Sequence, residues 1–405
     1  MEIGNLSVEA FRNLAPSRHG FHPRLNLLVG ANGQGKTNVL ESLALVSGRA
    51  SFRTADLSDV VRAGAPEASV SVRLSGPADG ALGAVLSKAR REHAWNGKKV
   101  SRLEASRRLP LVFLTNADLG RLGGPPADRR RALDRVGLAF EPGLASEFRR
   151  YEKARAARVA LLSSPGPADR DALSSFEEIL ALSGAAIAAA RRRHVGPLGR
   201  RLAETALLLG ARWPALSLRL VSDLPDDETP AGLAEALRHG LRSRQELERR
   251  AGRALFGPHR DDVRLLSGDT PLAARASSGE ARTLVLAWSL AERALLAEAG
   301  GALPVFAFDD FDSEWDPAVL ERFAETLPAD GQVFLTSARA TVARALPLPP
   351  GAVWEVVEGR LSPAGRLEGR APFLPAAARS CSGTTSKPPS SARSRSRACT
   401  SPPTR

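Results

Sequence analysis

The chain has 405 residues, 43% of them hydrophobic, which is enough for sizeable cores and for two or three domains. No run reaches the roughly 18 apolar residues of a membrane span, and the N-terminus lacks the features of a signal peptide, so we expect a cytoplasmic protein with no membrane partner. The two cysteines, Cys381 and Cys399, lie near the C-terminal end and the six histidines are scattered, which argues against a disulfide framework or a zinc site. The formal net charge of +13 favours an anionic partner such as DNA or RNA, although an arginine-rich background would give the same sign.

The first 115 residues have a mixed α/β pattern. Alternating or continuous apolar runs predict strands at 3–10, 25–29, 68–74 and 109–114. Asn96-Gly97 predicts a tight hairpin turn, because both residues accept positive φ angles. A helix is expected over residues 38–45.

Residues 30–37 match the phosphate-binding loop Gly-x-x-x-x-Gly-Lys-[Ser/Thr]. The predicted strand before it and the predicted helix after it supply the context that the motif needs. Glycines let backbone N–H groups wrap phosphates, and a helix N-terminus adds favourable partial charge. Lys36 is expected on the β- and γ-phosphates, and the Thr37 hydroxyl on Mg²⁺. The predicted nucleotide ligands are Gly30, Ala31, Asn32, Gly33, Gln34, Gly35, Lys36 and Thr37.

From about residue 125 to 250 helical patterns dominate. They predict helices over 128–138, 144–162 and 169–209, a break at 165–167, and a strand at 216–221. No heptad repeat runs through the segment, so we expect a compact helical insertion and not a long coiled coil.

The α/β pattern returns between about 255 and 360. It predicts strands at 263–266, 304–308, 332–336 and 352–357, with helices at 284–296 and 319–327. The last segment is rich in Ser, Arg, Pro and Thr, so it is expected to be disordered and basic.

An apolar run ends in Asp309 and Asp310, as in a Walker B motif. Asp309 would hold Mg²⁺ through water, and Asp310 would orient or deprotonate the attacking water. Aspartate is shorter than the more usual glutamate, so slow hydrolysis is expected. The alternative is a strand that simply ends in two solvated acids.

Ser277-Ser278-Gly279-Glu280 precedes the predicted helix near residue 281. The simpler interpretation is a helix cap, with Ser277 and Glu280 as a capping box. The other is a second phosphate-binding helix terminus.

The order of these motifs is that of an ABC-type ATPase head: Walker A at 30–37, signature at 277–280, Walker B at 309–310, and D-loop at 313–316. In finer detail residues 1–360 resemble the bacterial RecF family. The segments that carry this resemblance are 30–38 with Leu40-Glu41-Ser42, 51–53, 128–131 with Leu133-Asp134, and, most distinctively, 256–262.

Five positions depart from the family's pattern. Asn116-Ala117 replaces Pro-Glu before Asp118, and Glu280 replaces glutamine. Asp312 and Trp315 stand where apolar residues and leucine are expected. These changes spare the nucleotide ligands, but they put the coupling between ATP and DNA in doubt.

The resemblance implies an α/β fold: an ABC-type P-loop ATPase head with an inserted helical domain and a disordered basic C-terminal tail. The expected domains are 1–124 and 251–362 for the head, 125–250 for the helical insertion, and 363–405 for the tail. ATP would drive a homodimer in which Ser277 of one subunit caps, in trans, the nucleotide of the other. Further implied cofactor contacts are Arg12, Asn13, Ser278, Gly279, Glu280 and Asp316. The implied catalytic residues are Lys36, Asp309, Asp310 and Ser277, with Mg²⁺ held by Thr37 and Asp309.

The family's function would be ATP-dependent DNA binding in recombinational and replication-gap repair. Such a protein helps RecO and RecR to load RecA, supports the SOS response, and is a cytoplasmic, nucleoid-associated, slow DNA-stimulated ATPase. Candidate DNA contacts are Arg149, Arg150, Lys153, Arg191, Arg192 and Arg193. The alternatives are a hydrolysis-deficient ATP-gated DNA-binding module and another SMC/ABC-type DNA-maintenance ATPase.

Overall fold

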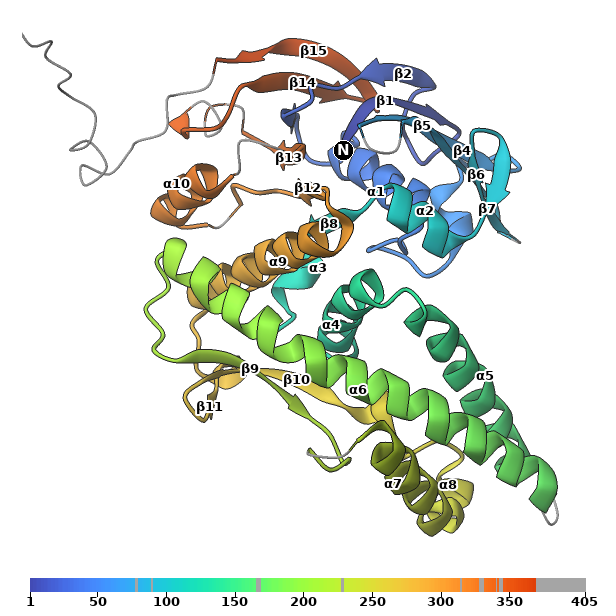
Figure 1. The fold of residues 1–405 in the computed structure, drawn as a ribbon. Coiled ribbons are helices and arrows are strands. Elements are labelled where there is room, and N and C mark those ends of the chain that lie inside the picture. The colour runs from blue at the N-terminus through green and yellow to red at the C-terminus, as the bar shows by residue number, and fades with distance from the viewer. Residues whose placement is uncertain are drawn as a thin grey trace, which may run out of the picture. The chain divides into compact units, whose positions relative to one another are not determined.

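Three sheets and the helices around them make up the structure (Figure 1). It is a computed structural model that describes residues 1–76, 79–88, 90–164, 169–226, 229–313, 315–327, 331–339, 341 and 345–368. All of these residues belong to one compact unit. The predicted disordered tail, 363–405, begins inside strand β15 (Arg360–Leu367), so the expectation of disorder is wrong for residues 363–367. The rest of the tail from residue 369, the break at 165–167 and Glu314 of the predicted D-loop lie outside the described residues.

A mostly parallel sheet forms the centre of the fold. In spatial order its strands are β15 (Arg360–Leu367), β14 (Gly351–Val357), β3 (Leu25–Val29), β13 (Val333–Ser337), β12 (Val305–Phe308) and β8 (Leu111–Leu114). All neighbours pair in parallel except β15, which is antiparallel to β14. Because the carboxyl ends of parallel strands meet at one edge, the segments that follow β3, β8, β12 and β13 come together there.

An antiparallel sheet lies over one face of the central sheet, with α1 (Lys36–Val46) between them. Its strands, in order, are β2 (Ser17–Gly20), β1 (Glu2–Glu9), β4 (Ala68–Ser75), β5 (Gly80–Leu86), β6 (Arg91–Trp95) and β7 (Lys98–Val100). Asn96 and Gly97 join β6 to β7 with φ angles of 47° and 79°, so the predicted hairpin turn is confirmed. The short helices α2 (Arg102–Arg108) and α3 (Asn116–Leu119) flank β8 in the chain.

Helices cover the other face of the central sheet. They are α9 (Ser278–Gly300), α10 (Pro317–Thr326), α4 (Pro126–Phe140) and the C-terminal half of α6 (Arg170–Leu208). Within β3, Leu25, Leu27 and Val29 join this core, whereas Leu28 joins the core around α1. The strand is therefore buried on both faces, which explains its continuous apolar sequence.

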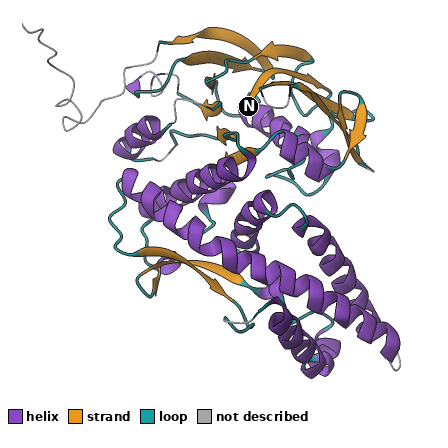
Figure 2. Ribbon diagram, viewed as in Figure 1, coloured by secondary structure: helices purple, strands orange, loops and turns teal. Residues whose placement is uncertain are grey.

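The helical part of the chain, whose helices are purple in Figure 2, has its own core. There α5 (Leu144–Ser163), the N-terminal half of α6, α7 (Pro230–Ser243) and α8 (Gln245–Ala251) pack together. A small antiparallel sheet of β9 (Leu216–Val221), β10 (Asp262–Ser267) and β11 (Thr270–Pro271) lies beside α6. Since α6 takes part in two cores, it ties the helical part to the central sheet.

Among the described helices, α6 alone is long and apolar enough by composition to cross a membrane. Within its most apolar window 56% of the residues are buried inside the protein. The core helix of a soluble protein passes the same test, so this finding is weak evidence for a span.

Most predicted elements are confirmed with small shifts at their ends. The sequence interpretation missed α2, α3, α7, α8, β2, β5, β11 and β15. For α7 a signal was present, because Thr229 accepts a hydrogen bond from the Gly232 N–H (3.2 Å) and Pro230 occupies the first helical position. The boundaries at 124, 250 and 362 remain predictions.

Candidate nucleotide-binding site

The phosphate-binding loop leaves β3 and enters α1 at the carboxyl edge of the central sheet. Gly30 passes so close to β14 that a Cβ there would lie 2.3 Å from the carbonyl oxygen of Val356. Gln34 is fixed to the β14–β15 turn: its carbonyl accepts from Gly359 N–H (2.8 Å) and its Oε1 from Glu358 N–H (2.6 Å). Strand β14 and the turn after it thus fix the position of the loop, which preorganises its N–H groups.

Lys36 is almost fully buried under this loop. Its Nζ donates to the carbonyl oxygens of Gly30 (2.7 Å) and Ala31 (3.0 Å), and only 4% of the residue is exposed. The ammonium group therefore lies inside the curve of the loop, where a phosphate would be bound.

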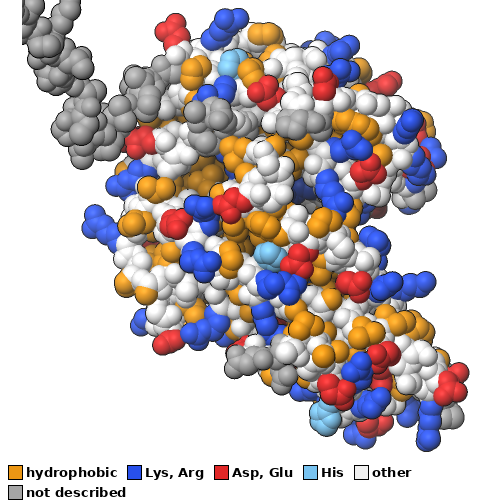
Figure 3. All heavy atoms as spheres, viewed as in Figure 1, with side chains coloured by type: hydrophobic (Ala, Val, Ile, Leu, Met, Phe, Trp, Pro, Cys, Tyr) orange, Lys and Arg blue, Asp and Glu red, His pale blue; other side chains and the backbone are white. Residues whose placement is uncertain are grey.

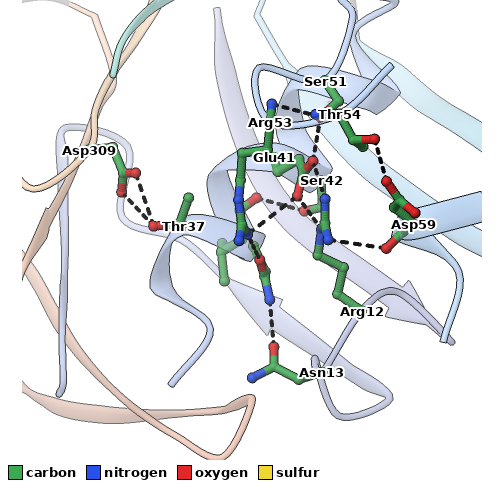
Figure 4. A network of polar contacts seen from close by, with 12 residues as sticks. Arg12, Asn13, Thr37, Glu41, Ser42, Ser51, Arg53, Thr54, Asp59 and Asp309 are labelled. Carbon is green, nitrogen blue, oxygen red and sulfur yellow. Dashed lines mark hydrogen bonds and ion pairs between the residues drawn. The ribbon is translucent and has the colours of Figure 1, made fainter. Parts of the chain in front are cut away.

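The Thr37 hydroxyl and the Asp309 carboxylate lie together, as the sequence predicts for a magnesium site. Thr37 Oγ1 is 3.0 Å and 2.9 Å from the two carboxylate oxygens (Figure 4). Thr336, at the end of β13, donates to Asp309 Oδ1 at 2.6 Å. Burial raises the pKa of Asp309, and the neighbouring charge of Asp310 raises it further. Hydroxyl and carboxylate oxygens are ligands that Mg²⁺ prefers, so the donor set fits that ion.

Asp310 has a backbone conformation that few residues adopt. Its φ angle is +47°, and its N–H donates to Thr336 Oγ1 at 2.7 Å. Thr336 therefore supports both acids, and the turn after β12 lets both Asp309 and Asp310 line the pocket. Strained conformations of this kind often occur at functional sites. Sequence reasoning missed Thr336, because a threonine at a strand end gives no local signal.

Lys36, Thr37, Asp309 and Asp310 line a single pocket of about 370 Å³. Its walls come from the phosphate-binding loop, the start of α1, the turn after β12, the turn after β8, and the loop that contains Phe52 and Arg53. Within the described part of the chain, no three His, Cys, Asp or Glu side chains gather as a metal cluster, so a bound cation would depend on phosphate and water as further ligands.

Arg12 and Asn13 lie beside the loop but are engaged by protein groups. Asn13 Nδ2 donates to the carbonyl oxygen of Gly33 (3.2 Å), and its Oδ1 accepts from Asn38 (2.7 Å). Arg12 forms a two-point ion pair with Glu41, at 2.5 Å and 2.9 Å. To contact a nucleotide as expected, Arg12 would therefore have to bind it while still paired with Glu41, or break this ion pair.

Glu41 is the centre of the network in Figure 4. It is fully buried on α1, and besides Arg12 it accepts from Ser51 Oγ at 2.5 Å. Arg53 Nη1 lies 3.9 Å from it and donates to Asn38 Oδ1 at 2.7 Å. Two segments that carried the family resemblance, 40–42 and 51–53, are thus brought together by one buried carboxylate.

The predicted signature forms the N-terminus of α9. Ser277 Oγ and Glu280 make the complete capping box, with the Ser277 N–H donating to Glu280 Oε2 at 2.9 Å. Ser277, Gly279 and Glu280 line a separate pocket of about 380 Å³ together with Asp316. The two pockets share no lining residue, so within this chain the signature does not complete the nucleotide pocket. Capping is therefore present, and contact of the signature with a nucleotide in trans remains a prediction.

Comparison with known proteins identifies the family to which the chain belongs. The model described as RecF/RecN/SMC N terminal domain matches residues 2–347. A DNA replication and repair protein RecF from Anaeromyxobacter dehalogenans is 35% identical over 374 residues, which is 90% of this chain and 99% of that protein. The chain belongs to the RecF family. The RecF protein of Myxococcus xanthus is 34% identical over 356 residues, covering 85% of this chain and 92% of the relative.

Solved structures agree on the fold. A structure of "the recombination mediator protein RecF-ATP in RecFOR pathway" superposes with a TM-score of 0.80 at 24% identity and covers 90% of this chain and 98% of that one. An Smc head bound to the C-winged helix domain of ScpA gives a TM-score of 0.52 at 16% identity, with coverage of 91% and 98%. The ABC-type ATPase head predicted from the motif order is therefore confirmed.

The departures from the RecF pattern are accommodated structurally. Trp315 packs edge-on against Phe308 with ring centres 5.2 Å apart, so it fills the place of a smaller apolar residue. Asp312 is buried but accepts from Ser337 Oγ at 2.8 Å. Asp118 still caps α3 through Thr115, despite Asn116-Ala117.

The RecF-like segment 256–262 belongs to a buried ionic network. Arg191 of α6 pairs with Asp261 (2.9 Å) and, through two bonds of 2.8 Å and 2.9 Å, with Asp134 of α4. Arg129 pairs in the same region with Asp262 (2.8 Å). The two family segments at 128–134 and 256–262 therefore fasten α4, α6 and β10 to one another.

This network corrects one expectation about DNA. Arg191 is 5% exposed and fully occupied, so the prediction that it contacts DNA is wrong. Arg193 pairs with Glu141 at 2.7 Å, and Arg192 donates to the backbone carbonyls of Leu224 and Pro225. On the face shown in Figure 3, basic side chains are interspersed with acidic ones and form no single basic patch.

Replacing Arg191 by alanine is expected to lower the free energy of unfolding by about 3–5 kcal/mol, because Asp134 and Asp261 would keep buried charges without their partner. Arg193→Ala, two residues along α6, removes a pair whose arginine side chain is 53% exposed and is expected to cost at most about 1 kcal/mol. Denaturant unfolding of both variants measures the difference. Equal stabilities would contradict a structural role for the Arg191 network.

Proposed function

We propose that this RecF-family chain is an ATP-dependent DNA-binding protein of recombinational and replication-gap repair. The observation that supports it most directly is the contact between the Thr37 hydroxyl and the Asp309 carboxylate beside the buried Lys36 ammonium. These are the groups that a P-loop ATPase needs for magnesium and for the terminal phosphates of ATP. Relatives named DNA replication and repair protein RecF support the wider role.

ATP would rest on Gly30–Thr37, with Mg²⁺ at Thr37 and Asp309. When bound, the ion neutralises phosphate charge. Asp310 would accept a proton from the water that attacks the γ-phosphorus, releasing ADP and phosphate. The pKa of Asp309, raised by burial, makes the site sensitive to acid, because a protonated carboxyl is a poor cation ligand.

The working unit would be a homodimer that ATP closes. Each nucleotide would be held by the loop of one subunit and capped by Ser277, Ser278, Gly279 and Glu280 of the other. Its support is the separation of the two pockets within one chain. Since ATP and DNA would favour the same closed dimer, each would tighten the binding of the other.

The proposed partners are DNA, RecR and RecO, and indirectly RecA, with a supporting role in the SOS response. The solved relative described within the RecFOR pathway supports RecO and RecR as partners. The proposed location is the cytoplasm, near the nucleoid. A hydrolysis-deficient, ATP-gated DNA-binding module remains the second candidate, because Asp310 is shorter than the glutamate usual at that position.

Sedimentation of the full chain with fluorescent duplex and gapped DNA, with and without ATP and Mg²⁺, tests the proposal. The expected result is an ATP-dependent dimer that carries DNA. If ATP binds but neither a dimer nor a DNA complex forms, the proposed ATP-closed dimer is wrong, whereas the nucleotide site is still supported.

Ser277→Arg is expected to abolish ATP-driven dimerisation while each monomer still binds ATP, because the bulky cation would occupy the face that meets the second nucleotide. It also removes a helix cap, worth about 1 kcal/mol. Ser101→Arg is the matched control, since Ser101 caps α2 in the same way by accepting from Glu104 N–H (3.1 Å). Dimers of the Ser277 variant in analytical ultracentrifugation would rule out the trans contact.

A further inference from the structure

A second hollow, which we call the interlobe groove, lies beside the nucleotide pocket. Its volume is about 820 Å³. One wall is the loop after α1 together with the start of α2; the other is α4 with the start of α5, as can be followed in Figure 1. The groove shares Phe52, Arg53, Thr115 and Ala117 with the nucleotide pocket, so the two are continuous.

The groove has more positive than negative charge. Six arginines and three aspartates line it. Three of the arginines are neutralised by carboxylates, in the pairs Arg121–Asp118, Arg131–Asp128 and Arg135–Glu292. The remaining three are Arg49, Arg53 and Arg102, and all lie on the wall formed by the loop after α1 and α2.

All three arginines donate hydrogen bonds to neutral oxygens, although Arg53 also lies 3.9 Å from the buried Glu41 carboxylate. Arg49 donates to the carbonyl oxygen of Leu111, Arg102 to that of Gly48 (3.3 Å), and Arg53 to the Asn38 side chain. Among the residues that the structure describes, no carboxylate forms an ion pair with Arg49 or Arg102. Their positive charge therefore remains available to an anion in the groove.

Part of the reason for these arginines is structural. Arginines near the C-terminus of α1 stabilise its carbonyl groups and dipole. However, only one hydrogen bond, from Nε, is recorded for Arg102, which is exposed and keeps further N–H donors. Burial lowers the pKa of Arg49 to about 10, so the group is still protonated at neutral pH, in a place where a bound anion would stabilise it.

The aromatic side chains and the volume of the groove limit which ligands it can bind. Phe52 and Phe113 lie on one wall with ring centres 5.8 Å apart, and Phe148 lies on the other. Planar rings beside cations suit bases and phosphates together. The volume falls in the range of sites for small ligands, about 300–1,000 Å³. The groove therefore fits a short stretch of one strand and is too small to enclose a duplex.

We propose that the interlobe groove binds a short single-stranded segment of nucleic acid, with phosphates at Arg49, Arg53 and Arg102 and bases against Phe52 and Phe148. The inference rests on the proposed DNA-binding function and assigns it a site. Because Arg53 and Phe52 also line the nucleotide pocket, the strand and ATP would affect one another's affinity by the same factor.

The test is fluorescence anisotropy of the full chain with a labelled oligothymidine, at several salt concentrations, in the presence of ATP and Mg²⁺. Arg102→Gln is expected to weaken binding and to lower the salt slope by about 0.7, the value for one phosphate of a single strand. Phe148→Ala should weaken binding about fivefold or more, as loss of one stacked base does. Thermal unfolding shows whether each variant is folded.

Two matched controls remain outside the groove. Arg107→Gln makes the same change on the same helix, and Phe140→Ala removes an exposed ring at the end of α4. Both should bind like the wild type. Groove variants that equal these controls would overturn the inference, as would wild-type protein that binds duplex but no oligothymidine. A further contrary result would be that polyglutamate competes with the oligothymidine in a way that is lost in Arg102→Gln but kept in Phe148→Ala. That result would indicate that the groove binds an acidic protein, and it would also overturn the inference. Wild-type protein that binds no DNA of any kind would instead refute the proposed function.

Discussion

Replacing Lys36 by alanine is expected to weaken ATP binding by about 100-fold or more. The ammonium lies inside the phosphate-binding loop, 2.7 Å from the carbonyl oxygen of Gly30 and 3.0 Å from that of Ala31. It is nearly buried, so its interaction with a phosphate would be little screened by water. Charge-assisted hydrogen bonds of this kind are worth roughly 1.5–3 kcal/mol each, and a phosphate would accept more than one.

Isothermal titration of the full chain with ATP and Mg²⁺ measures this loss. Lys153→Ala is the matched control, because Lys153 is exposed on α5 outside the nucleotide pocket. It makes the same substitution and should leave ATP affinity unchanged. If Lys36→Ala bound ATP with the affinity of the wild type while remaining folded, the nucleotide site would have to lie elsewhere.

The parts of the site that could be predicted from the sequence are those in which the chemistry is local. The loop at 30–37 has its glycines, lysine and threonine at fixed spacing, so strand, turn and helix follow one another without help from distant residues. Asp309 at the end of an apolar strand was predictable for the same reason. A parallel sheet then brings both strand ends to one edge, which explains why Thr37 and Asp309 meet across 272 positions.

Contacts that depend on tertiary packing could not be predicted. Thr336 supports both acids, and Glu41 gathers Arg12 and Ser51, but neither has a distinctive neighbourhood in the sequence. The segment 256–262 was noticed only as a family feature. Its role depends on partners on α4 and α6, such as the Asp261–Arg191 pair.

The position of Arg191 follows from the helical periodicity of α6. Composition alone makes all three of Arg191, Arg192 and Arg193 candidates for DNA contact, yet a helix turns each of them in a different direction. Ile187 and Ala188 are buried, and Arg191 follows them by four and three positions, so it continues the buried face of α6. Arg193 falls on the exposed side. Helical phase would have separated a structural arginine from a solvent-facing one.

Asp310→Asn is expected to leave ATP binding intact and to reduce turnover by about 10²–10⁴-fold, the usual contribution of a general base. The substitution removes the proton-accepting carboxylate without changing the backbone conformation. Asp310 has a φ angle of +47°, and asparagine adopts that region as readily as aspartate, so the turn and its N–H bond to Thr336 should survive.

Phosphate release under single-turnover conditions, with ATP affinity measured in parallel, decides the role of Asp310. Asp269→Asn is the control: it makes the same change at a side chain that is 92% exposed and paired with Arg219, outside the nucleotide pocket. Full turnover in Asp310→Asn would show that another group activates the water. If the wild type itself hydrolyses no ATP, even with DNA, then the shorter carboxylate does not reach the water, and ATP acts in this chain only as the ligand that closes the dimer.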